Sequence, residues 1–104
     1  MVDAFKILNQ NGIKVSTIFV LPSELHHSQD DVNQGKVRAI LKDLKDGKKM
    51  PLIVVSNDNY IVDGHHRQIA YKTRSPNEKI KVVVIDLPKN EAIKVYKEIE
   101  QLIK

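Results

Sequence analysis

The sequence contains no cysteine and no tryptophan, and it has only two phenylalanines and three tyrosines in 104 residues. The lack of cysteine excludes disulfide bonds, thiolate metal ligands and a thiol nucleophile. Because aromatic rings are so few, aliphatic side chains must fill the core. The sequence also shows no long apolar segment and no basic, apolar leader, so we expect no membrane contact and a cytoplasmic location.

The composition is that of a folded domain with a modest positive charge. Hydrophobic residues make up 41% of the chain and charged residues 29%, which is enough apolar surface for one domain spanning 1–104. Seventeen basic residues against 13 acidic ones give a net charge of +4. This excess favours an anionic partner such as a nucleotide or nucleic acid. It is equally typical of a mildly basic soluble protein, because the lysines are spread out.

The spacing of apolar residues predicts alternating strands and helices. Val37, Ile40, Leu41 and Leu44 follow the i, i+3, i+4, i+7 pattern of an amphipathic helix over 32–46, which Gly47 ends. Strands are predicted over 13–20, 51–55, 60–62 and 80–85, and further helices over 3–10, 65–74 and 90–103. The strand over 51–55 is uniformly apolar, and a tight turn over 56–59 makes it a hairpin with 60–62. This order predicts an α/β (α+β) fold, a small mixed sheet with flanking helices.

The stretch from residue 60 to 67 carries the most chemistry. An apolar run stops at Asp63 and Gly64, and His65, His66 and Arg67 then open the predicted helix. A glycine lets the backbone turn and approach a ligand closely. The first turn of a helix presents unpaired N–H groups and the positive end of a dipole, and a guanidinium there can bind phosphate oxygens. The pattern therefore predicts a phosphate site formed by these residues.

Three residues of this stretch admit more than one role. An aspartate before a helix is a ready N-cap, but Asp63 can equally hold Mg²⁺ or orient a nucleophile. Adjacent helical residues do not share a face, so one histidine should face the ligand and the other should be structural or exposed. We expect His66 to face the ligand and to transfer protons. Asp63 and His66 are thus the candidate catalytic residues, and Asp63 the candidate metal ligand.

Two other polar groups have a simple and a functional interpretation. His26 and His27 fit a solvated loop, although with Asp63, His65 and His66 they would make a zinc or manganese site if the loop folded over. A basic group ends the long predicted helix: Lys42, Lys45, Lys48 and Lys49. Cations suit the negative end of a helix dipole, and the same lysines suit contact with a nucleic-acid backbone.

The residues Gly64-His65-His66-Arg67-Gln68-Ile69-Ala70 fit the G-x-x-R-x-x-A box of the ParB N-terminal domain and resemble the phosphate loop of sulfiredoxin. The stretch Asp63–Arg67 also resembles the motif of ParB-like free serine kinases. The element order over 15–85, about two thirds of the chain, is similar to that superfamily. The resemblance implies a ParB/sulfiredoxin-like fold that binds ATP or another nucleotide, usually with Mg²⁺. Gly64, His65, His66, Arg67 and Gln29 would contact the nucleotide.

The chain departs from this superfamily at two informative positions. His65 stands where sulfiredoxin needs its cysteine, which excludes that activity. Gln29 lies near the place of the kinases' catalytic glutamate, and an amide cannot act as a general base. Glu24 or Asp30 could replace it only after a shift of the loop, whereas a glutamine here is common among ParB-like proteins. ParB proper carries a helix-turn-helix domain and a dimerisation domain after this one, and we expect neither within these 104 residues.

Three functions remain open from the sequence. The first is a ParB-like nucleotide-binding protein with Mg²⁺-dependent phosphodiester (nuclease) or nucleotide hydrolysis, linked to DNA through non-specific backbone contacts. In it, Arg67 stabilises phosphate charge, Asp63 places Mg²⁺ and His66 transfers a proton. The second is a small-molecule phosphotransferase resembling the free serine kinases. The third is a non-enzymatic nucleotide- or DNA-binding module. The oligomeric state stays open as well.

Overall fold

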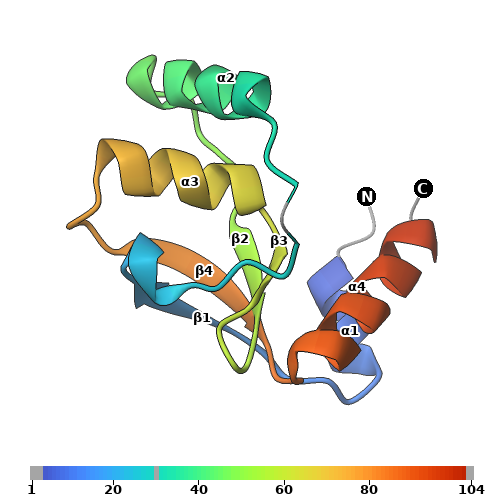
Figure 1. Ribbon diagram of the computed structural model, residues 1–104. Coiled ribbons are helices and arrows are strands. Elements are labelled where there is room, and N and C mark those ends of the chain that lie inside the picture. The colour runs from blue at the N-terminus through green and yellow to red at the C-terminus, as the bar shows by residue number, and fades with distance from the viewer. Residues whose placement is uncertain (1–3, 30, 103–104) are drawn as a thin grey trace.

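A computed structural model describes residues 4–29 and 31–102, and it contains a four-stranded sheet between helical layers (Figure 1). The elements follow one another as α1 (Ala4–Gln10), β1 (Val15–Val20), the 3₁₀ helix η1 (Pro22–Glu24), α2 (Gln34–Lys45), β2 (Ile53–Ser56), β3 (Ile61–Asp63), α3 (His65–Arg74), β4 (Ile80–Ile85) and α4 (Lys89–Leu102). Helix α3 packs on one face of the sheet, and α2 lies on α3. Helices α4 and α1 pack on the opposite face.

The sheet is mixed, as the sequence predicts. Its strand order is β1-β4-β2-β3. β4 runs antiparallel to β1 and parallel to β2, while β2 and β3 form the predicted antiparallel hairpin. The turn of this hairpin is closed by the Ser56 N–H, which donates to the Tyr60 carbonyl at 2.9 Å, and Asn59 has a φ of 65°. The connection from β2 to the parallel strand β4 runs through β3 and α3, and α3 begins directly after β3.

Each face of the sheet carries its own apolar cluster. The cluster beneath α3 consists of Val20, Leu25, Ile53, Val55, Ile61 and Val82. The cluster beneath α4 and α1 consists of Leu8, Val54, Ile85, Ala92 and Ile99. Burial on both faces explains why β2 reads as a continuous apolar run. The prediction that this run begins at Pro51 is wrong, because Pro51 and Leu52 are exposed and precede the strand.

Local hydrogen bonds set the element ends that the sequence misplaced. Helix α2 begins at Gln34 rather than at residue 32, because the Asn33 side chain accepts the Lys36 N–H at 3.1 Å as an N-cap. β1 begins at Val15 rather than at Ile13, whose N–H donates to the Leu8 carbonyl at 2.9 Å and so ends α1. The predicted ends of the first and last helices, residues 3 and 103, lie outside the described residues. Within the described ranges, no helix has the length and apolarity needed to cross a membrane.

Candidate phosphate-binding cleft at the start of α3

A cleft of about 470 Å³ lies between α2 and the first turn of α3. It is lined by Gln29, Lys36, Ala39, Ile40, Asp63, Gly64, His65, His66 and Arg67. The fold therefore brings together every residue that the sequence analysis assigned to the phosphate site, including Gln29 from the distant loop before α2. A smaller hollow beside the start of α2 shares Gln29, Lys36 and His66 with this cleft.

The backbone at the start of α3 depends on Gly64. This residue is the N-cap, with φ 110° and ψ 27°, and no side chain caps the helix. The Gln68 N–H is the first to reach a helix carbonyl, that of Gly64 at 2.9 Å. Among residues 4–29 and 31–102, no acceptor pairs with the N–H groups of residues 65–67. The first turn therefore has free donors at the cleft, as an anion site requires.

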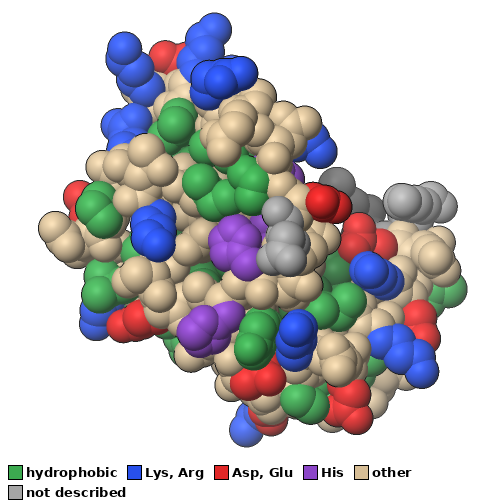
Figure 2. All heavy atoms as spheres, in the orientation of Figure 1, with side chains coloured by type: hydrophobic (Ala, Val, Ile, Leu, Met, Phe, Trp, Pro, Cys, Tyr) green, Lys and Arg blue, Asp and Glu red, His purple; other side chains and the backbone are tan. Residues whose placement is uncertain are grey.

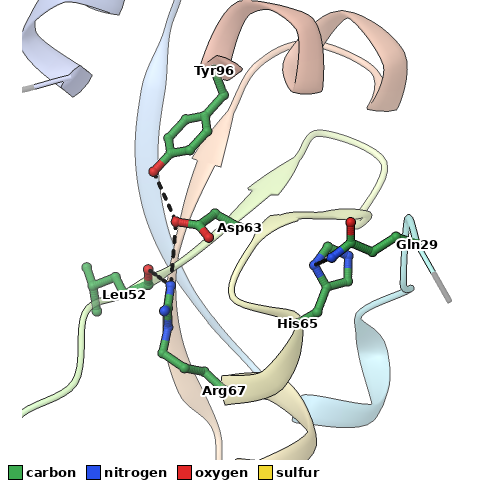
Figure 3. Close-up of polar contacts among 6 residues, drawn as sticks. All are labelled: Gln29, Leu52, Asp63, His65, Arg67 and Tyr96. Carbon is green, nitrogen blue, oxygen red and sulfur yellow. Dashed lines mark hydrogen bonds and ion pairs between the residues drawn. The ribbon is translucent and has the colours of Figure 1, made fainter. Parts of the chain in front are cut away.

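Arg67, in the first turn of α3, supplies a mostly buried positive charge. Its side chain is 17% exposed, and one terminal nitrogen, Nη2, donates to the Leu52 carbonyl at 3.3 Å (Figure 3). The same nitrogen lies 3.7 Å from Asp63 Oδ2. The Nε atom is buried and has no hydrogen-bond partner within the described part of the chain. The guanidinium thus keeps hydrogen-bonding capacity that no described residue uses.

Asp63 is held by a residue that the sequence analysis did not place in the site. Its Oδ2 accepts a hydrogen bond from the Tyr96 hydroxyl of α4 at 3.1 Å and faces Arg67 (Figure 3). Burial first, and then the charge of Asp63, raises the pKa of Tyr96. The N-cap interpretation of Asp63 is wrong, because the residue ends β3 and Gly64 occupies the cap position. Tyr96 lies 33 residues away in the sequence, so only the tertiary fold shows its hydroxyl meeting Asp63.

His65 fastens the loop before α2 to α3. The residue is 5% exposed, and its Nε2 accepts the Ser28 N–H at 3.2 Å, while the Ser28 hydroxyl donates to the Ile61 carbonyl at 2.6 Å. Its Nδ1 lies 3.5 Å from the Gln29 side-chain amide. Burial, followed by repulsion from His27, lowers the pKa of His65, so the imidazole is neutral at pH 7.

The loop that holds His26 and His27 is partly exposed: His26 is exposed, as the simpler prediction expects, whereas His27 and Ser28 are half-buried. His27 Nε2 hydrogen-bonds Gln68 Oε1 at 2.7 Å, and the Gln68 side-chain N–H donates to the Pro22 carbonyl at 2.8 Å. His26 instead lies beside Tyr60, with ring centres 5.3 Å apart, away from the cleft. Over residues 4–29 and 31–102, no three His, Cys, Asp or Glu side chains gather into a metal site.

His66 points from α3 toward the start of α2. Its Nε2 accepts the Asn33 N–H at 3.0 Å, so the neutral ring carries its proton on Nδ1. The two adjacent histidines therefore diverge, as expected, His65 toward the loop and His66 toward α2. Both line the cleft.

Lys36 is the charged cleft residue that the sequence analysis missed. It lies in the first turn of α2 and adds a second cation opposite α3. The available signal was a lysine three residues after Asn33, a residue type favoured at helix N-caps. Of the two proposed substitutes for a catalytic glutamate, Glu24 is not among the residues that line the cleft, and its side chain accepts the Leu21 N–H at 3.2 Å. Asp30 lies outside the described residues.

The surface around the cleft is basic on the α2 side. In Figure 2, Lys and Arg side chains gather over α2, above the histidines. Lys42 and Lys45 lie in the last turn of that helix, where they meet the negative end of its dipole. Lys48 forms an exposed ion pair with Asp43 at 3.3 Å, so part of this charge is already compensated.

The comparisons with known proteins bear on the fold. No protein-family model matches the chain, and no curated protein matches it. A solved form of a pNOB8-like ParB-N domain superposes with a TM-score of 0.65 at 14% identity, covering 86% of this chain and 38% of that one. A second solved pNOB8-like ParB N-domain gives a TM-score of 0.66 at 17% identity, covering 86% and 35%. The protein therefore has a ParB N-domain-like fold, and it spans little more than a third of those chains.

Proposed function

We propose that the protein is a ParB-like nucleotide-binding module, and that the cleft at the start of α3 takes the phosphate chain of ATP or another nucleotide. One observation carries the proposal. The unpaired N–H groups of residues 65–67 open onto a cleft that also contains Arg67 and Lys36. Backbone donors, a helix dipole and two cations are together complementary to a phosphate group.

Each part of the cleft has a distinct role in this proposal. The amides after Gly64 bind one phosphate group, and the free N–H donors of Arg67 fix the orientation of that phosphate. Lys36 neutralises a second phosphate from the α2 side. The Gln29 side chain, at the cleft wall beside His65, donates to a ribose or phosphate oxygen. His66 donates from Nδ1, because its Nε2 lone pair is used by Asn33.

The residues support binding more strongly than hydrolysis. Mg²⁺ is commonly held by one or two carboxylates together with the phosphates of the substrate. Asp63 is the one carboxylate lining the cleft among the described residues, and its Oδ2 is engaged by Tyr96 and Arg67. It would supply a single ligand to Mg²⁺. His66 would have to release Asn33 before its Nε2 accepted a proton, so proton transfer by His66 requires a rearrangement.

The fold and the charge together support a proposed link to DNA. The solved proteins of similar fold are ParB N-domains, and the surface over α2 is basic. Contacts of Lys42, Lys45 and Lys49 with a phosphate backbone would be independent of sequence and would weaken with salt. In this proposal the nucleotide cleft and the DNA-facing lysines lie at opposite ends of α2.

Calorimetric titration with the four ribonucleoside triphosphates, with and without Mg²⁺, tests the proposal. Arg67→Gln and Lys36→Gln each remove one charged hydrogen bond, which contributes about 1.5–3 kcal/mol, so affinity should fall roughly 10- to 100-fold. Arg74→Gln on α3 and Lys42→Gln on α2 are matched controls, because both residues are exposed and outside the cleft. No binding at millimolar nucleotide, or equal losses in the control variants, would contradict the proposal.

A further inference from the structure

β1 forms one edge of the sheet and leaves that edge open. It pairs with β4 along its whole length, and no strand in the described ranges pairs with its other side. Residues 16–19 are exposed, including the large side chains of Ile18 (39%) and Phe19 (64%). The other edge, β3, is covered, because the Ile61 N–H donates to the His26 carbonyl at 2.8 Å and His26 bridges to Tyr60. Within residues 4–29 and 31–102, β1 is therefore the open edge of the sheet.

The hydrogen bonds to β4 show which backbone groups of β1 point outward. The Asp86 N–H donates to the carbonyl of Lys14, its opposite residue in the antiparallel register, at 2.9 Å. Opposite residues alternate between hydrogen-bonded and non-bonded pairs along an antiparallel ladder. Ser16, Ile18 and Val20 therefore also bond to β4. The N–H and C=O groups of Val15, Thr17 and Phe19 point away from the sheet.

The strand lacks the devices that protect edge strands. Natural edges are blocked by charged side chains, prolines, bulges or very short length. β1 is six residues long, reads Val-Ser-Thr-Ile-Phe-Val, and contains no charge, proline or glycine. Its register with β4 has no irregularity, unlike that of β2 with β3. An unprotected edge of this kind pairs readily with another strand.

We propose that β1 is a homodimer interface, in which two copies pair antiparallel about Thr17. The outward groups dictate this register. The two Thr17 residues exchange both of their hydrogen bonds, and Val15 of each copy pairs with Phe19 of the other, so three outward residues per copy are satisfied. A twofold contact of this kind is self-complementary. Lys14 falls opposite Val20, so no like charges meet across the pair.

The side chains agree with this register. Val15, Thr17 and Phe19 lie on the α4 face of the sheet, where Val15 packs against the cluster beneath α4 and α1. The exposed Phe19 ring then lies beside the partner's Val15 and extends that apolar layer. Aromatic and β-branched residues form favourable cross-strand pairs. The twofold axis is perpendicular to the sheet, so the dimer has one eight-stranded sheet with both α3 clefts on the same side.

Sedimentation velocity of the full chain at high micromolar concentration tests the interface. The wild-type protein should sediment as a dimer, and Thr17→Pro as a folded monomer, because proline removes an outward N–H and leaves the β4 ladder intact. Thr17→Ala keeps that N–H and should remain dimeric. Phe19→Lys, which places a charge in the pair, is a second monomerising variant should the proline disturb folding.

Disulfide trapping checks the register separately. In this register the two Thr17 Cα atoms lie about 5.5 Å apart, within the range that a disulfide spans. Since the chain has no cysteine, oxidised Thr17→Cys should form a covalent dimer, and Ser23→Cys, exposed in η1, should not. A monomeric wild-type protein, a dimer that survives both Thr17→Pro and Phe19→Lys, or equal trapping at position 23 would overturn the proposal.

Discussion

Replacing Gly64 with alanine tests whether the backbone at the start of α3 has the geometry described. The φ of 110° is unfavourable for any residue with a Cβ, at about 1–2 kcal/mol. The new Cβ would also lie 3.0 Å from both Arg67 Nη2 and Ile53 Cγ1. Crowding of a packed site adds about 1–3 kcal/mol. Gly64→Ala should therefore destabilise the protein by roughly 2–5 kcal/mol and displace the Arg67 guanidinium.

Gly47→Ala is the matched control for this prediction. Its φ is 74°, and a Cβ there would meet no atom within 4 Å, so this variant carries the backbone term alone. Urea unfolding of both variants gives the difference, which should be about 1–3 kcal/mol in favour of Gly47→Ala. Equal stabilities for the two variants would refute the close packing of Gly64 against Arg67 and Ile53.

Three further predictions concern side chains around the cleft. The pKa of His65 is lowered from 6.5 in the folded state, so the unfolded chain binds the proton better. The unfolding free energy should therefore fall as pH drops below about 6.5, and urea unfolding at a series of pH values should show a smaller fall for His65→Gln. Asn33→Ala removes the α2 cap and should cost about 1 kcal/mol by urea unfolding, whereas Gln34→Ala should cost almost nothing. Tyr96→Phe removes the hydroxyl bonded to Asp63 and should lower the unfolding free energy by about 0.5–1.5 kcal/mol; no change would show that the bond is absent in solution.

The sequence predicted the parts of the fold that local patterns determine. The bounds of α3 and β4 agree with the predicted ranges 65–74 and 80–85, because apolar spacing and the Ser75-Pro76 pair mark them clearly. The start of α2 was placed two residues early, since the apolar pattern begins only at Val37 and the cap that fixes the boundary is Asn33.

The candidate site was predicted where its residues are contiguous; among its distant residues, the family resemblance supplied Gln29, but Tyr96 and Lys36 were missed. Gly64 and Arg67 lie in one recognisable box, so their meeting in the cleft followed from the sequence. Tyr96 and Lys36 come from other helices, and only the packing of α4 and α2 places them near Asp63 and the first turn of α3. The packing of the histidine loop on α3 depends on long-range bonds such as Ser28 to His65, which no local pattern encodes.

Amide chemical shifts during nucleotide titration test the central claim most directly. In ¹⁵N-labelled protein, the backbone N–H signals of His65, His66 and Arg67 should move most as ATP or another triphosphate is added, because those groups become hydrogen-bond donors to phosphate. Signals from α4 residues facing away from the cleft, such as Lys94, should stay in place. Unmoved signals at residues 65–67 under saturating nucleotide, or larger shifts elsewhere, would contradict a phosphate site at the start of α3.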